Sequence, residues 1–204
     1  MSEEKALSAV PERSERARER ALRTASELFY AKGVRAVGME EIVAQSGVAK
    51  TTIYRHFPSK DELVRAFLEH EDAEFWAQWD EVVGQIEGRP ALAALCAWIG
   101  QRVLRDGYRG CPQINAVAEF SNPGHQAALV ARSHKDEMHR RLTALCAQTG
   151  ATGAQKVAMQ IALLFDGAFT SDGRLAGMDA AALLSDAVSR LLQTDDKEKA
   201  ATGG

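Results

Sequence analysis

Residues 49–56 (AKTTIYRH) bring together side chains that can hydrogen-bond to nucleic acid. In a helix, Ile53 would face the core and the polar neighbours would face solvent. The exposed set would be Lys50, Thr51, Thr52, Tyr54, Arg55 and His56. These side chains supply cationic and neutral donors, two methyl-bearing hydroxyls and an aromatic ring, with no acid among them. Such a surface can contact phosphates and the edges of bases.

The elements around this segment decide between that function and a merely solvated basic helix face. Residues 39–45 and 49–57 are each predicted to be a short helix, and Ser46-Gly47 between them predicts a tight turn. A helix over residues 11–32 precedes them and carries Leu28 and Phe29 toward a shared core. Three helices with a tight turn between the last two form the helix-turn-helix pattern, which places its last helix in the major groove.

Residues 20–67 resemble the N-terminal domain of the TetR family of transcriptional regulators. The most specific part is GVAKTTIYRHFPSKDEL, in which a glycine, an aromatic pair and Ser-Lys stand at fixed spacing. The resemblance implies a recognition helix whose DNA-contacting residues are Lys50, Thr51, Thr52, Tyr54 and His56. It also implies that Lys60 contacts phosphate at the start of the next helix. For Tyr54, burial of the ring with only the hydroxyl exposed is the competing interpretation.

The chain departs from the family pattern at the starts of both short helices. The family usually has Thr or Ser where this chain has Gly38 and Met39, and often Ser where it has Ala49. Both helices therefore lack a hydroxyl cap, a loss of about 1 kcal/mol each. The free amides at Gly38 and Met39 can still bind phosphate, so both residues belong to the predicted DNA interface.

An all-α fold of about nine helices is predicted. Of the 204 residues 46% are hydrophobic, Gly (16) and Pro (5) are sparse, and strand-forming runs of Val, Ile and Thr are absent. Beyond the first three, helices are expected over 59–86, 90–106, 113–120, 122–148, 152–175 and 179–193. The predicted domains are a helix-turn-helix domain (11–58) and a ligand-binding and dimerisation domain (59–193), with disordered tails (1–10 and 194–204).

Charge is distributed unevenly along the chain. Residues 1–60 hold 11 Lys and Arg against 8 Asp and Glu, whereas residues 61–204 hold 14 against 20. A basic head on an acidic body suits a protein that meets phosphate at one end, although chance alone can produce a difference of this size. The longest apolar run (91–99) is too short to cross a bilayer, and the N-terminus lacks a signal-peptide core. We therefore expect a cytoplasmic protein with no membrane partner.

The C-terminal part is expected to bind a small molecule. Residues 109–125 (RGCPQINAVAEFSNPGH) and 163–169 (LLFDGAF) resemble the ligand-binding domain of one TetR subgroup, which implies a pocket for a small, largely apolar effector among the middle helices. Ordinary core packing is the competing interpretation for each aromatic residue, and a paired or solvated side chain for each polar one. The candidate lining residues are Phe75, Trp76, Trp79, Trp98, Arg102, Asn115, Phe120, His134, Met138, Phe165, Asp166 and Phe169.

The last two predicted helices are expected to join two chains into a homodimer. Each carries an apolar stripe, and one chain would have difficulty burying both, whereas two copies could form a four-helix interface. On the first of these helices the candidates are Ile161, Leu164, Gly167 and Ala168, with the glycine allowing close approach. On the second they are Leu183, Leu184, Ala187, Val188 and Leu191.

Other function classes find less support in the sequence. There is no glycine-rich nucleotide loop, nucleophile elbow or metal-ligand spacing, so no enzyme, cofactor or metal is expected. His134 and His139 lie about 140° apart on a helix, which excludes a shared metal. A thiol sensor at Cys111 and a helical interaction module that binds no DNA remain alternatives. The family resemblance implies a regulator, usually a repressor, that binds a palindromic operator as a dimer and is released by its effector.

Overall fold

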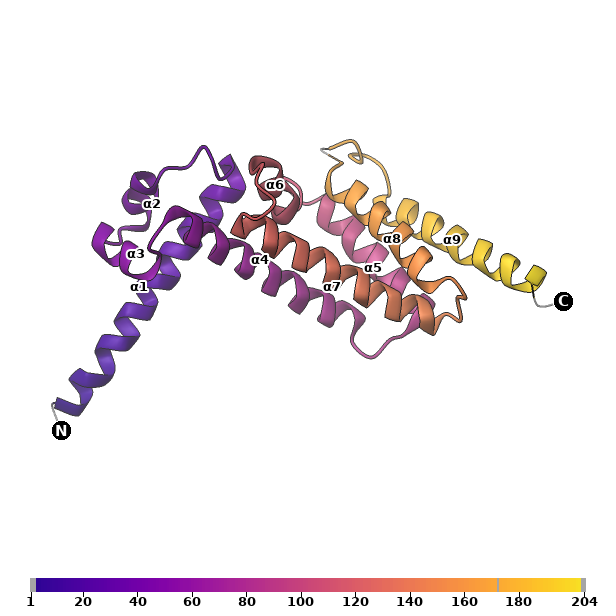
Figure 1. Cartoon of the computed structure of the whole chain (residues 1–204), viewed down its shortest axis with the longest axis horizontal. Helices are drawn as coiled ribbons and strands as arrows, with labels where there is room; N and C mark the ends of the chain where they lie inside the picture. Colours follow the sequence, from indigo (N-terminus) through magenta and orange to yellow (C-terminus); the bar gives the residue numbers. More distant parts are fainter. Residues whose placement is uncertain (1–2, 172, 203–204) are drawn as a thin grey trace. The chain divides into compact units, whose positions relative to one another are not determined.

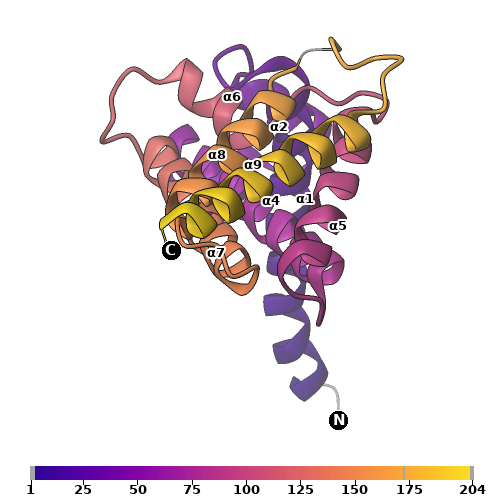
Figure 2. The same ribbon diagram turned by 90° about the vertical axis from the view of Figure 1, so that its right-hand side faces the viewer.

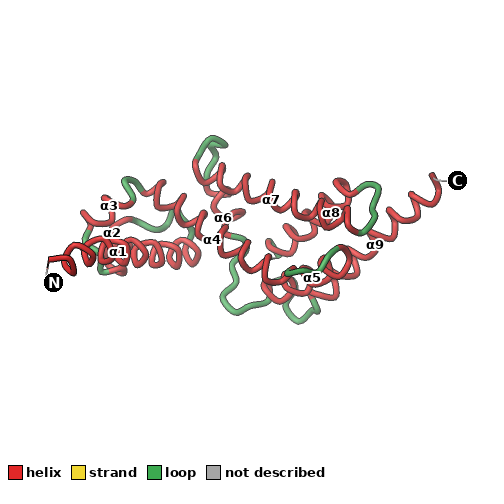
Figure 3. The backbone as a smooth tube through the Cα atoms, turned by 90° about the horizontal axis from the view of Figure 1, so that it is seen from below, coloured by secondary structure: helices red, strands yellow, loops and turns green. Residues whose placement is uncertain are grey.

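The computed structural model describes residues 3–171 and 173–202, and in this part of the chain every regular element is a helix (Figures 1 and 3). The predicted all-α fold is confirmed. The helices are α1 (Glu3–Lys32), α2 (Met39–Ser46), α3 (Lys50–His56), α4 (Lys60–Val83), α5 (Gly88–Val103), α6 (Pro112–Glu119), α7 (Gln126–Gln148), α8 (Ala154–Phe169) and α9 (Ala180–Thr202).

Both tails are helical where disorder was expected. Helix α1 begins at Glu3 and α9 ends at Thr202, so residues 3–10 and 194–202 extend helices that start or continue in the folded part. These stretches are rich in Ala, Glu and Lys, which have high helix propensity, and adding residues to an existing helix avoids the cost of nucleation. Residues 1, 2, 203 and 204 of the predicted tails lie outside the described residues.

Local capping signals position the starts of α4 and α9. The hydroxyl of Ser59 accepts a hydrogen bond from the Glu62 amide at 3.1 Å, as the capping-box pattern predicts. The Glu62 carboxylate accepts hydrogen bonds from Arg65 and Gln126 instead of completing the box. At α9, Asp179 accepts from the Ala182 amide at 2.9 Å.

Several predicted helix boundaries differ from the structure, and the differences at α7 and α8 have local causes or are large. Helix α7 begins at Gln126, because the side chain of Asn122 accepts from the Gly124 amide at 2.9 Å and forms a turn rather than a cap. Helix α8 has Gly153 as its N-cap, with no side-chain cap, and ends at Phe169 rather than near residue 175.

Contacts divide the chain into two compact units. The first, called the head unit here, comprises Met1–Glu71 and Pro112–Ala131; the second, the body unit, comprises Asp72–Cys111 and Arg132–Gly204. Chain order alone does not indicate that residues 112–131 group with the N-terminal helices. The predicted boundary between a DNA-binding domain (11–58) and a ligand-binding domain (59–193) concerns function rather than compactness, and it stays a prediction.

The head unit is held by an apolar core and by polar contacts from α6. The rings of Phe29 and Phe67 lie 5.6 Å apart, and burying each such side chain stabilises the fold by roughly 1.5–3 kcal/mol. The Glu119 carboxylate, at the end of α6, accepts hydrogen bonds from the amides of Val34 and Arg35 at 2.9 and 2.6 Å. It therefore fixes the loop after α1 to a segment that follows it by more than eighty residues.

In the body unit, α5 and α9 approach closely at a glycine. A Cβ atom placed on Gly100 would lie 2.5 Å from the backbone nitrogen of Ala181, so only glycine fits this crossing. Helices α8 and α9 lie side by side (Figure 2). The buried faces of α5, α8 and α9 thus form one core, and the opposite faces of α8 and α9 are open.

Candidate nucleic-acid interface and effector region

The turn between α2 and α3 has the geometry that its sequence predicts. Gly47 adopts a left-handed conformation (φ 62°, ψ 20°), and its amide donates to the carbonyl of Val43 at 3.2 Å. The hydroxyl of Ser46 accepts from the Val48 amide at 3.2 Å and closes the turn. Ile42 and Ile53 are completely buried and fix the two helices against each other.

Helix α3 buries Ile53 and directs its polar side chains outward. Lys50, Thr51 and Arg55 are exposed, and Thr52 and His56 are half-buried. Tyr54 is 37% exposed, so burial of its side chain in the core is not observed. Most of the residues predicted to contact DNA are therefore accessible to solvent on α3, and their role in reading bases stays a prediction.

Three of the predicted contact residues have partners within the chain. The ammonium of Lys50 lies 3.2 Å from a carboxylate oxygen of Glu40 and 6.0 Å from the centroid of the Tyr54 ring. A hydrogen bond from its own backbone amide, together with the Lys50 ammonium, lowers the pKa of Glu40. His56 pairs through Nε2 with the Ser14 hydroxyl at 3.2 Å. Lys50 must therefore exchange Glu40 for any DNA group that it binds.

The residues predicted to contact phosphate at the starts of α2 and α4 differ from one another in exposure. Gly38 is exposed, is extended (φ −90°, ψ 157°) and provides no side-chain cap. Met39 is 7% exposed, so its side chain packs in the core and only its backbone amide could meet phosphate. Ala49 likewise provides no cap for α3. Lys60 is half-buried at the first position of α4.

Comparison with known proteins decides the family. The sequence profile for "Bacterial regulatory proteins, tetR family" matches residues 21–67. A solved TetR-family transcriptional regulator from Streptomyces coelicolor is 30% identical, with a TM-score of 0.82 over 87% of this chain and 95% of that one. The chain belongs to the TetR family. A putative TetR regulator from Streptomyces avermitilis is 28% identical, with a TM-score of 0.79 over 88% of this chain and 98% of that one.

Two curated relatives match over short segments, so this chain spans about a quarter or less of their length. The HTH-type transcriptional activator FasR of Mycolicibacterium smegmatis is 49% identical over 45 residues, which are 22% of this chain and 20% of the relative. An HTH-type transcriptional repressor of Mycobacterium tuberculosis is 41% identical over 49 residues, 24% of this chain and 26% of the relative. This TetR-family chain is thus a DNA-binding transcriptional regulator, and the family membership excludes the enzyme alternative.

The body unit of this regulator contains a cluster of aromatic side chains around Phe75. This ring is buried at the meeting point of four helices, α4, α5, α7 and α8. Its centroid lies 4.9–6.2 Å from those of His134, Trp76, Trp98, Trp79 and Phe169. The Arg102 guanidinium lies 5.7 Å from both the Phe75 and Trp98 rings and donates to Gln78 at 2.8 Å. Several predicted pocket residues are therefore in contact.

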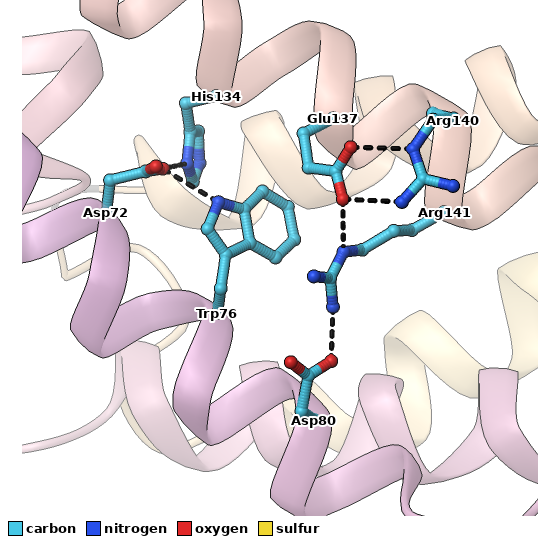
Figure 4. A network of polar contacts seen from close by, with 7 residues as sticks. All are labelled: Asp72, Trp76, Asp80, His134, Glu137, Arg140 and Arg141. Carbon is cyan, nitrogen blue, oxygen red and sulfur yellow. Dashed lines mark hydrogen bonds and ion pairs between the residues drawn. The ribbon is translucent and has the colours of Figure 1, made fainter.

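A polar network borders this cluster (Figure 4). One Asp72 oxygen accepts from the Trp76 indole at 2.8 Å and pairs with His134 Nδ1 at 2.6 Å. Because a carboxylate only accepts, Nδ1 carries the proton and Nε2 is left as an acceptor. His134 is 2% exposed and its Nε2 has no hydrogen-bond partner. Burial lowers the pKa of His134 despite the opposing attraction of Asp72, which favours the neutral form of the ring.

Other predicted pocket residues are placed in different surroundings. Met138 and Phe165 are fully buried in the body unit. Asp166 forms an ion pair with Lys135. Asn115 is exposed in the head unit. Phe120, also in the head unit, stacks on His125 with ring centroids 3.9 Å apart.

The predicted dimer residues divide between the core and the surface. Ile161, Ala168, Leu184 and Val188 are buried within the chain. Leu164, Ala187 and Leu191 are half-buried, and Gly167 is exposed with no atom within 4 Å of a Cβ built on it. Leu183 is 51% exposed. Sequence reasoning missed two large apolar side chains on the open face of α8, Met159 and Leu163, of which Leu163 is 64% exposed.

The remaining alternatives meet little support in the described part of the chain. Cys111 is buried, not partly exposed as a reactive thiol requires, and burial raises the pKa of Cys96 to about 11. Among the described residues no His, Cys, Asp and Glu side chains gather in a group able to hold a metal. In that same part of the chain, no helix combines the length and the apolar character needed to cross a membrane.

Proposed function

We propose that this TetR-family regulator is a repressor that binds a palindromic operator as a homodimer in the cytoplasm and is released by a small, largely apolar effector. Residues 11–58 would bind DNA, and residues 59–193 would bind the effector and the second chain. The observation that carries the proposal is the acid-free exposed face of α3 beyond the Gly47 turn. Repression is proposed because the family resemblance implies it as the usual mode, and the matched relatives include both an activator and a repressor.

The open face of α8 and α9 supports the homodimer. Met159, Leu163 and Leu183 expose large apolar side chains on neighbouring helices, and the exposed Gly167 of α8 leaves room for the approach of a second helix. An apolar face of this kind is characteristic of a protein interface. A two-fold dimer then presents two α3 helices to successive major grooves, roughly 34–36 Å apart or a little more, which requires a near-palindromic site.

The aromatic cluster in the body unit supports an effector with a defined chemistry. Phe75, Trp76 and Trp98 offer apolar ring surface, and the neutral His134 offers one buried, unpartnered acceptor at Nε2. A buried acceptor without a partner is unfavourable, so a ligand that donates a hydrogen bond gains from meeting it. A neutral aromatic molecule with a hydroxyl or N–H donor therefore fits better than an anion.

The DNA-binding proposal is tested by selecting bound duplexes from random sequence. The wild-type protein should recover a near-palindrome. Lys60→Ala should weaken binding to every duplex and reduce the slope of log affinity against log salt by about one. Lys50→Ala should relax base preference more than it lowers affinity. Equal recovery of all sequences by the wild type would contradict operator recognition and leave a nonspecific helical module.

Effector release is tested by reciprocal titration. Tryptophan fluorescence should report binding of phenol more strongly than binding of toluene, because only phenol can donate to His134. An effector that prefers the DNA-free form about 100-fold has a coupling free energy of about 2.7 kcal/mol, and operator DNA must weaken effector binding by the same factor. Equal affinity for the effector with and without operator would exclude release by this route.

A further inference from the structure

The head unit has a basic groove between α1 and α3. Its volume is about 660 Å³, and its lining includes three arginines, two from α1 and one from α3. The lining residues are Arg13, Ser14, Ala17, Arg20, Gly47, Val48, Ala49, Thr52 and Arg55. Among the described residues, no carboxylate belongs to this lining. All of its residues lie in the head unit, so its geometry is fixed by one compact body.

Among the described residues the groove arginines have no acidic partner, whereas three other cations of the head unit do. Lys32, Lys50 and Arg65 pair with Glu41, Glu40 and Glu62 at 2.6, 3.2 and 2.7 Å.

Within the described residues, Arg13 and Arg55 form no ion pair. Arg20 donates only to a neutral acceptor, the carbonyl of Gly47, at 3.4 Å. The groove thus concentrates positive charge that the protein does not neutralise, which is unfavourable until an anion arrives.

The shape of the cationic groups indicates which anion fits. A guanidinium presents a planar fork of donors that matches two oxygens of a phosphate. Thr52 and Arg55 line the groove and also lie on α3, whose exposed face would read bases. A strand whose bases meet α3 would therefore carry its phosphates past the same groove, where α1 supplies cations from outside the helix-turn-helix.

We propose that this groove binds phosphodiester groups of the operator backbone, with Arg13 and Arg20 of α1 acting together with Arg55 of α3. The proposal rests on the DNA binding set out above and adds α1 to the interface. A free phosphate or nucleotide offers the same chemistry as the backbone, so the experiment must separate a duplex from a free anion.

The test measures the affinity of Arg13→Ala and Arg20→Ala for the duplex selected by the wild type, over a range of salt concentrations. Each should weaken binding about tenfold or more, because it removes a charge-assisted hydrogen bond. Each should also flatten the salt slope by about one unit and leave base preference unchanged. Arg23→Ala, at an exposed α1 position outside the groove lining, is the matched control and should bind like the wild type.

Folding is checked separately, because Arg20 holds the Gly47 carbonyl. Thermal melting should show Arg13→Ala unchanged, since Arg13 makes no ion pair within the described residues; this variant therefore tests the groove even if Arg20→Ala unfolds. If Arg13→Ala folds and matches the wild type in affinity and salt slope, the proposal is wrong. An equal loss in Arg23→Ala would also overturn it, because the effect would then not belong to the groove.

A competition arm separates the two sources of phosphate. Inorganic phosphate at about 10 mM, added at constant ionic strength, should not displace the duplex, because a single free anion lacks the other contacts. Displacement under these conditions would assign the groove to a free anion and overturn the proposal. If the wild type binds duplexes without sequence preference but Arg13→Ala still flattens the salt slope, operator recognition fails while the groove proposal stands.

Discussion

Two adjacent leucines of α9 should respond in opposite ways to the same substitution. Leu183 is 51% exposed and Leu184 is 8% exposed, although they are neighbours in the chain. If α8 and α9 form a dimer interface, Leu183→Glu places a carboxylate against the second chain. Leu184→Glu places it in the core of its own chain. The first change should separate the dimer, and the second should unfold the protein.

The expected magnitudes follow from burial. Full burial of a leucine contributes roughly 1.5–3 kcal/mol, so the exposed half of Leu183 contributes about 1 kcal/mol per chain and about 2 kcal/mol per dimer. Forcing two carboxyl groups into the interface costs roughly 2 kcal/mol or more in addition. The sum, about 4 kcal/mol, raises the dissociation constant about a thousandfold. In Leu184→Glu the buried carboxyl removes a large part of a typical stability of about 5–15 kcal/mol.

Sedimentation velocity at micromolar concentration and thermal melting distinguish these outcomes. Leu183→Glu should sediment as a monomer and retain its helical circular dichroism, whereas Leu184→Glu should lose its cooperative melt. Leu163→Glu, on the open face of α8, should behave like Leu183→Glu. A wild-type monomer, or a Leu183→Glu dimer with an unchanged dissociation constant, would refute the assignment of this face.

Three further substitutions probe other features. Gly100→Ala should lower the free energy of unfolding by about 1–3 kcal/mol in urea titrations, because its Cβ would meet the Ala181 backbone at 2.5 Å. Burial lowers the pKa of His134, so at acidic pH the unfolded chain binds a proton that the folded chain binds less readily. The free energy of unfolding should therefore decline as the pH falls below about 6.5, the ordinary pKa of histidine. Melts at pH 5 and 7.5 should show a smaller decline for His134→Gln than for the wild type. Glu40→Gln should raise operator affinity a few-fold in a gel shift, because it frees Lys50 and removes a negative charge; weaker binding would contradict this.

Features set by neighbouring residues could be predicted from the sequence. The α2–α3 turn depends on a glycine that tolerates positive φ, and the starts of α4 and α9 depend on Ser59 and Asp179, which accept hydrogen bonds from amides three residues ahead. These interactions involve only a few residues along the chain. Asn122 shows where such local prediction fails. An asparagine can either cap a helix or form a turn, and in this chain it forms a turn.

Features set by distant contacts could not be predicted in this way. The spacing of apolar residues along the sequence predicts apolar faces on α8, but it does not predict which of these faces packs against the rest of the chain. Ile161 proves to be buried and Leu163 exposed. The side that faces inward is determined by packing within the body unit, where Gly100 admits the backbone of α9. The attachment of α6 to the loop after α1 through Glu119 likewise depends on residues more than eighty positions apart.

The distribution of ion pairs explains why net charge is a poor guide to the DNA interface. The whole chain has a formal charge of −3, and many of its cations are neutralised locally, as Lys50 is by Glu40. An exposed ion pair of this kind contributes little to stability, so breaking it costs little when Lys50 binds DNA. The small free energy lost with the Glu40 contact is nevertheless subtracted from what the Lys50–DNA contact contributes. Within the part of the chain that the structure describes, Arg13 and Arg55 pair with no carboxylate that DNA would have to replace. Affinity should therefore depend more on these unpaired arginines, and base selection more on the exposed face of α3.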